Sequence, residues 1–130
     1  MKSRTAPVSQ EATAKYEADI ELAGKFDALF EQAQAAEREL RAAQAERAPL
    51  ARQHDLAKRL DAALTDVMRA AFAAERVEIG LRGYDDRIYR RKAKATPKVR
   101  IWTHEAQRLL TLRESHRLTG IPRLPRHPAA

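Results

Sequence analysis

Apolar side chains recur at steps of three and four residues over most of the first 79 positions, which is the spacing of one face of an α-helix. In residues 9–48 this stripe contains Tyr16, Ile20, Phe26, Phe30 and Leu40. Ser9 is a residue type that caps helix starts, and Gly24 weakens the middle of the pattern and indicates a bend or a close contact. The pattern predicts a helix over residues 9–48.

A second stripe follows Pro49 and has the alternating steps of four and three that a coiled-coil seam requires. Its members are Leu60, Leu64, Val67, Ala71 and Ala74. Gly80 is placed to end this helix, which is predicted over about residues 50–79. Pro49 either begins this second helix or kinks a continuous one, and a tight reversal there would make residues 1–79 an antiparallel helical hairpin.

Alanine fills many positions of both stripes, with 26 copies in the chain, so the two predicted helices bury little area against each other. We therefore expect the hairpin to need a partner protein, a second copy, or a third helix from its own chain. The expected partner interface consists of Tyr16, Ile20, Phe26, Phe30, Leu60, Leu64 and Val67. The alternative is that residues 84–118 supply the third layer.

The pattern changes at residue 80, and residues 80–120 are predicted to form a basic helical segment on or near the hairpin. Asp85 and Asp86 can cap a short helix that reaches about Ala95, which Pro97 would end. Residues 98–102 alternate charged and apolar side chains and are predicted to be extended or a short strand. A final helix is predicted from Glu105 through Leu118 with Thr103 as its N-cap, followed by an extended Pro-rich tail at 121–130. The expected fold class is all-α.

Positive charge is concentrated in the last two-fifths of the chain. The 130 residues carry a formal net charge of +7. Residues 1–79 hold 12 Lys and Arg against 14 Asp and Glu, whereas residues 80–130 hold 13 against 4. This asymmetry indicates a polyanionic partner for the C-terminal segment, the alternative being an ordinary solvated surface that is rich in arginine.

The strongest local signal is the acid-free run at residues 87–100, which the aromatic residue Tyr89 interrupts. Cations on one helix face repel one another unless a polyanion screens them, and aromatic rings beside cations can stack on bases. We predict contacts to DNA or RNA from Arg82, Arg87, Tyr89, Arg90, Arg91, Lys92, Lys94, Lys98 and Arg100. The alternatives are a solvated face and an acidic protein surface.

Motifs of catalysis are incomplete in this sequence. His104 and Glu105 begin a zinc-protease pattern, but Arg108 stands where the second histidine ligand belongs. The chain has no cysteine, and its four glycines form no phosphate-binding loop. We expect no catalytic residues, no metal and no cofactor. The longest apolar run, residues 70–74, is far too short to span a membrane, and a cytoplasmic protein is expected.

In size, alanine- and leucine-rich helices, one basic side and the lack of an active site, the chain resembles the small helical subunit of multi-protein CRISPR effector complexes. The resemblance implies a non-catalytic, nucleic-acid-binding subunit or accessory factor of a larger nucleoprotein assembly. Two other functions remain open. One is a coiled-coil adaptor that binds an acidic protein, and the other is a plasmid- or phage-type DNA-binding regulator.

Overall fold

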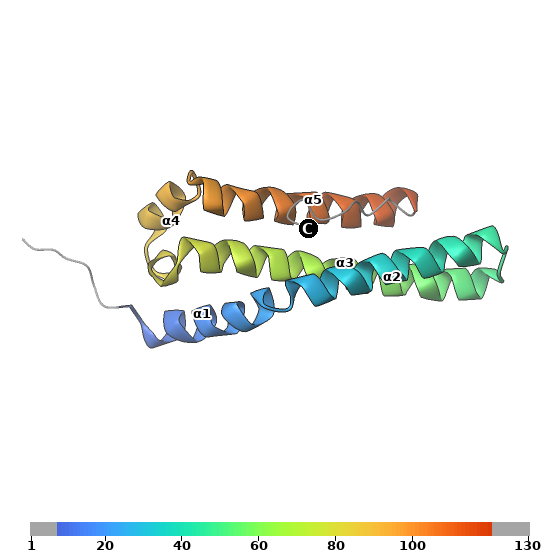
Figure 1. Ribbon diagram of the computed structural model, residues 1–130, viewed down its shortest axis with the longest axis horizontal. Helices are drawn as coiled ribbons and strands as arrows, with labels where there is room; N and C mark the ends of the chain where they lie inside the picture. The colour runs from blue at the N-terminus through green and yellow to red at the C-terminus, as the bar shows by residue number, and fades with distance from the viewer. Residues whose placement is uncertain (1–7, 121–130) are drawn as a thin grey trace, which may run out of the picture.

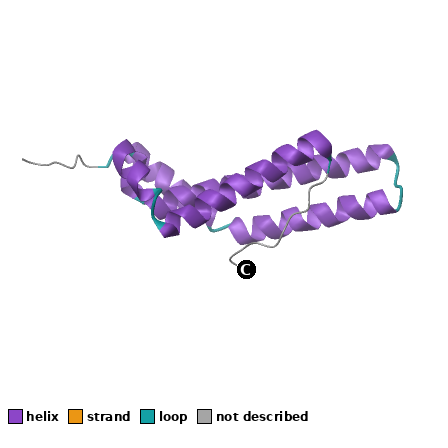
Figure 2. Cartoon of the chain, turned by 90° about the horizontal axis from the view of Figure 1, so that it is seen from above, coloured by secondary structure: helices purple, strands orange, loops and turns teal. Residues whose placement is uncertain are grey.

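A computed structural model describes residues 8–120, and the predicted tail at 121–130 lies outside this range. In the described part every regular element is a helix, which confirms the all-α prediction (Figures 1 and 2). The elements are α1 (Gln10–Ala23), α2 (Phe26–Ala45), α3 (Leu50–Ile79), the 3₁₀ turn η1 (Leu81–Tyr84), α4 (Arg87–Ala93) and α5 (Pro97–Thr119).

The single helix predicted over residues 9–48 is two helices. Ser9 caps α1 as expected, with its hydroxyl oxygen accepting from the Ala12 amide at 3.0 Å. Helix α1 ends with Gly24 as its C-cap, and the backbone departs from helical angles at Lys25 before α2 begins. The apolar stripe nevertheless continues across this break at steps of three and four. Phe26, just after the break, is buried, whereas Gly24 is exposed. A continuous apolar stripe therefore did not require a continuous helix.

Pro49 lies in a tight reversal between α2 and α3. Arg47 adopts a positive φ of 55°, and the Ala48 amide donates to the Ala43 carbonyl at 2.9 Å. Helix α3 then runs for 30 residues and ends at Gly80, whose φ is 105°. The predicted antiparallel hairpin and the predicted bounds of its second helix are confirmed.

Residues 98–102 are not extended, as the alternation of charged and apolar side chains suggested, but form the first turns of α5. Pro97 is the first residue of this helix, where its missing amide hydrogen costs nothing, and Thr96 is the N-cap residue. The apolar residues that this part of α5 packs against the core are Val99 and Ala106, both buried, with Trp102 half-buried between them. Their spacing of three and four is helical, and the shorter alternation obscured it.

The core forms around α3, against which α1, α2 and α5 all pack. Helix α5 runs antiparallel to α3 (Figure 1), and polar contacts join the two helices near both ends of α5. Near its start the Thr103 hydroxyl donates to the buried Glu75 carboxylate. Near its end Arg117 forms an ion pair with Asp61 at 2.7 Å. The start of α2 also touches α5 through an edge-to-face contact of Phe26 with Trp102, with ring centres 5.0 Å apart.

This arrangement determines where the expected partner interface lies. Five of its residues are buried inside the chain: Phe26, Phe30, Leu60, Leu64 and Val67. Tyr16 is half-buried against Tyr84, and Ile20 is 46 % exposed. Because α5 adds Ala106 and Leu109 to the same apolar cluster, the third layer comes from this chain itself. The five buried residues are therefore not available to a partner in this fold.

Candidate nucleic-acid interface

Helix α4, its connection to α5 and the first turn of α5 carry a group of exposed cations, which we call the basic corner. Its members are Arg87, Arg91, Lys92, Lys94, Lys98 and Arg100. Within residues 8–120, no carboxylate lies at ion-pair distance from any of them. The corner stands at the end of the molecule opposite the α2–α3 turn (Figure 1).

The other three predicted contact residues have partners within the fold. The Arg82 guanidinium carbon lies 4.7 Å from the centre of the Tyr89 ring, and its Nη2 is 3.3 Å from the Asp86 carboxylate. Arg90 is half-buried and donates from Nη1 to the Gly83 carbonyl at 2.6 Å. Because Arg82 covers one face of Tyr89, that face is not open to a stacking base.

Local structure explains how α4 tolerates its charges. Asp86 caps the helix start by accepting from the Tyr89 amide at 2.9 Å. The hydrogen bond from this amide is the largest effect on the pKa of Asp86 and, together with Arg82, holds that pKa below its ordinary value. Arg90, Arg91 and Lys92 lie in the last turn, where the helix dipole favours cations.

At the start of α5, by contrast with α4, the local structure does not offset the charges of the cations. The first turn of α5 contains no acidic residue, and it places Lys98 and Arg100 at the positive end of the helix dipole. Thr96 makes no capping bond to α5, because its hydroxyl donates to the Ala93 carbonyl at 2.7 Å instead. The first amides of α5 therefore have no capping side chain. A bound anion would satisfy them and relieve the unfavourable placement of the two cations.

Two large apolar side chains are exposed among these cations. Ile88 on α4 is 70 % exposed, and Ile101 on α5 is 59 % exposed. Both follow a basic residue in the chain, so the surface that a partner would meet at the basic corner is mixed rather than purely cationic.

Sequence reasoning found the cations of the basic corner but missed the uncapped helix start between them. The interpretation of residues 98–102 as extended concealed it. The pair Thr96–Pro97 was the available signal, because a capping residue type followed by proline is typical of a helix N-terminus as well as of a helix end.

Comparisons with protein-family models, with curated proteins and with solved structures give no significant match to this chain. In residues 8–120, no helix combines the length and apolar character needed to cross a bilayer. The same residues contain no cluster of three or more His, Asp or Glu side chains placed to hold a metal ion.

Proposed function

We propose that the basic corner binds the sugar–phosphate backbone of a nucleic acid, as part of a non-catalytic subunit or accessory factor of a nucleoprotein assembly. The observation that carries this proposal is the set of six exposed cations, which have no carboxylate partner in the described fold, around the uncapped start of α5. Phosphates lying across this surface would release condensed counterions, which drives association without reading base sequence.

The cations of the basic corner differ from arginines that form ion pairs within the fold. Arg76 and Arg117 each form an ion pair at 2.7 Å, with Asp19 and Asp61, that joins one helix to another. Arg87, Arg91 and Lys94 lie at steps of three and four on and just after α4, which places them on one face. A strand that follows this face reaches the first turn of α5, where Lys98 and Arg100 extend the contact.

Binding of fluorescent 20-nucleotide single-stranded RNA, single-stranded DNA and duplex DNA, measured by anisotropy between low and moderate salt, tests this proposal. We expect log Kd to rise linearly with log salt, with a slope near 0.7 per phosphate for single strands and 0.9 for duplex. The triple variant Arg87→Gln/Arg91→Gln/Lys94→Gln should weaken binding at least tenfold and lower the slope by about 2 to 3.

A matched control variant removes the same charge elsewhere. Arg38, Arg52 and Lys58 are exposed and lie on α2 and the first part of α3, away from the basic corner. The variant Arg38→Gln/Arg52→Gln/Lys58→Gln should keep the affinity within about twofold and keep the full slope, because only the general field of the protein changes. Equal losses in the two triple variants, or no binding at low salt, would contradict the proposal.

A second function has one specific observation in its favour. Ile88 and Ile101 are exposed beside the cations, and an acidic protein with apolar contacts would use both kinds of side chain. In that case Ile88→Ser/Ile101→Ser would abolish capture of the partner from a lysate treated with nuclease, with the partner then identified by mass spectrometry. For a phosphate backbone, the same variant should change oligonucleotide affinity less than about threefold.

A further inference from the structure

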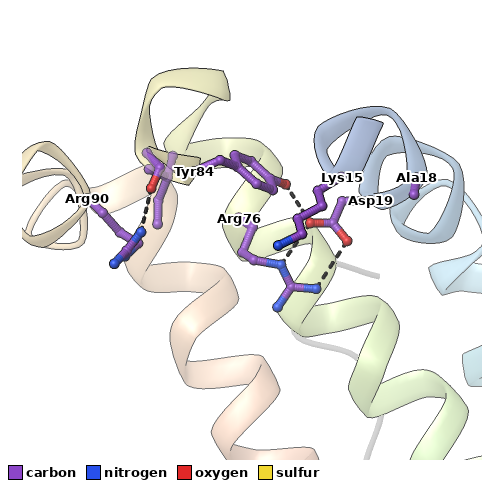
Figure 3. Close-up of a pocket in the computed structure, with 8 residues that line it drawn as sticks. Lys15, Ala18, Asp19, Arg76, Tyr84 and Arg90 are labelled. Carbon is purple, nitrogen blue, oxygen red and sulfur yellow. Dashed lines mark hydrogen bonds and ion pairs between the residues drawn. The ribbon is translucent and has the colours of Figure 1, made fainter. Parts of the chain in front are cut away.

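A pocket of about 420 Å³ lies where α1, the last turns of α3, η1 and α4 meet (Figure 3). The residues that define its chemistry are Lys15, Asp19, Arg76, Ile79, Tyr84 and Arg90. In Figure 3 the side chains of Lys15, Arg76 and Tyr84 converge near Asp19, whereas the guanidinium of Arg90 lies on the far side of Tyr84, bonded to the Gly83 carbonyl. Four elements that are far apart in the sequence therefore contribute to one cavity.

The walls of this pocket are fixed by a polar network. Asp19 accepts from Arg76 Nε at 2.7 Å, from Arg76 Nη2 at 3.1 Å and from the Tyr84 hydroxyl at 2.5 Å. Burial would raise the pKa of Asp19, but these hydrogen bonds and the charge of Arg76 outweigh it and hold the pKa below its ordinary value. The amide of Ser9 donates to Asp85 at 2.8 Å and ties the start of α1 to the same end.

Cations outnumber acids in this pocket. Lys15, Arg76 and Arg90 line it together with a single carboxylate, that of Asp19. Within the described residues, Arg76 uses Nε and Nη2 on Asp19, and Arg90 uses Nη1 on Gly83, so each guanidinium keeps N–H groups for a further acceptor. The ammonium of Lys15 has Glu11 at 3.8 Å, but both side chains are largely exposed, so the pair is weak.

The remaining surface of the pocket is apolar. It comes from Ala18, Ile79 and Gly83, and a Cβ atom at Gly83 would stand only 2.4 Å from Ile79 Cγ2. A volume of about 420 Å³ is within the range of small-molecule sites and exceeds what one phosphate group fills. Cations above an apolar surface suit a ligand that has an anionic end and an organic body.

We propose that this pocket binds a nucleotide through its terminal phosphate. The proposal rests on the proposed function, because Arg90 joins the pocket to α4: a strand whose backbone lies on the basic corner reaches the pocket with its end. Lys15 and the remaining N–H groups of Arg76 bind the terminal phosphate, while the sugar lies against Ile79, toward the side of the pocket that Arg90 lines. A terminal phosphate monoester carries more negative charge than an internal diester, so the cations favour the end over the middle of a strand.

Oligonucleotides of one sequence that carry a 5′-phosphate, a 3′-phosphate or hydroxyl groups at both ends test this directly, in RNA and DNA form. With the full chain, we expect the strand with either the 5′-phosphate or the 3′-phosphate to bind about tenfold more tightly than the hydroxyl-ended strand. Lys15→Gln should remove most of this preference and leave binding of the hydroxyl-ended strand unchanged. Lys25→Gln, which removes another exposed lysine that does not line the pocket, should keep the preference.

Nucleoside monophosphates, titrated alone and followed by calorimetry, form a second arm that distinguishes a free nucleotide from a strand end. If strands bind with equal affinity for all three ends and the monophosphates do not bind, the inference is wrong while the proposed function stands. If no strand binds, the proposed function fails, and the monophosphate titration alone then tests whether the pocket binds a nucleotide. Binding that Lys15→Gln weakens and Lys25→Gln does not would support a nucleotide site, and no binding would overturn it.

Discussion

Gly83 allows η1 to lie directly on the last turn of α3. It is buried, and a Cβ atom there would stand 2.4 Å from Ile79 Cγ2. Gly24 is exposed and has helical backbone angles, and a Cβ there would make ordinary contacts at 3.4 and 3.5 Å. The two glycines therefore have different roles. The sequence indicates a break near each of them, but it cannot show that only Gly83 faces another side chain.

Alanine substitution distinguishes the two glycines. Gly83→Ala should lower the free energy of unfolding by about 1–3 kcal/mol, because Ile79 must move. Gly24→Ala should leave it unchanged or raise it by up to about 1 kcal/mol, because alanine restricts the unfolded chain. Urea unfolding followed by circular dichroism measures both. Equal effects of the two substitutions would contradict the close contact at Gly83.

Asp19 gives the fold an acid-sensitive contact. Because its pKa is lowered in the folded state, its contribution is present above the unfolded value near pH 4 and is lost as the pH falls through the folded value. Asp19→Asn should therefore lower stability by about 1 kcal/mol at pH 7 and have little effect at pH 2. Thermal unfolding of both proteins across this range measures the difference, and a difference independent of pH would contradict the account.

Helix α5 connects the folding of the chain to its candidate function. Its first turn belongs to the basic corner, and the rest of its length is held on α3 by buried residues such as Leu109. Near its C-terminal end, His116 is buried with Nε2 at 2.9 Å from the Ala57 carbonyl. Docking of α5 therefore fixes the orientation of Lys98 and Arg100 relative to α4.

Leucine truncation tests this docking. Leu109 is fully buried, whereas Leu118 on the same helix is 82 % exposed. Leu109→Ala should lower the free energy of unfolding by about 2–4 kcal/mol, since it leaves a cavity beside α3. Leu118→Ala should change it by less than about 0.5 kcal/mol. Chemical denaturation compares the two variants, and a small effect at Leu109 would show that α5 is not part of the core.

The elements that sequence reasoning predicted best are those with long, regular apolar spacing. Helix α3 has the predicted bounds, and α4 begins after the predicted cap at Asp86. Short segments were harder, because residues 98–102 fit two periodicities and only the packing of Val99 on the core decides between them. The pocket could not be predicted at all, since Lys15, Arg76 and Arg90 meet only after α1, α3 and α4 are assembled.

At the scale of the whole molecule, the fold is elongated and its two ends differ. The α2–α3 turn forms one end, and η1, α4 and the start of α5 form the other (Figure 1). The six cations of the basic corner lack carboxylate partners in the described residues, whereas Arg117 and Arg41, on α5 and α2, pair with Asp61 and Glu37 at 2.7 and 2.8 Å. The six cations of the basic corner are therefore grouped at one end of the molecule.

The most direct test of this account is a residue-by-residue map of binding. In a titration of ¹⁵N-labelled full-length protein with a 20-nucleotide strand at low salt, we expect the amide signals of residues 87–101 to shift progressively. Signals of residues 45–60, around the α2–α3 turn, should stay in place, and the shifts should be reversed by added salt. Shifts centred on the α2–α3 turn, or no shift anywhere, would contradict the central claim that the basic corner carries the phosphate contacts.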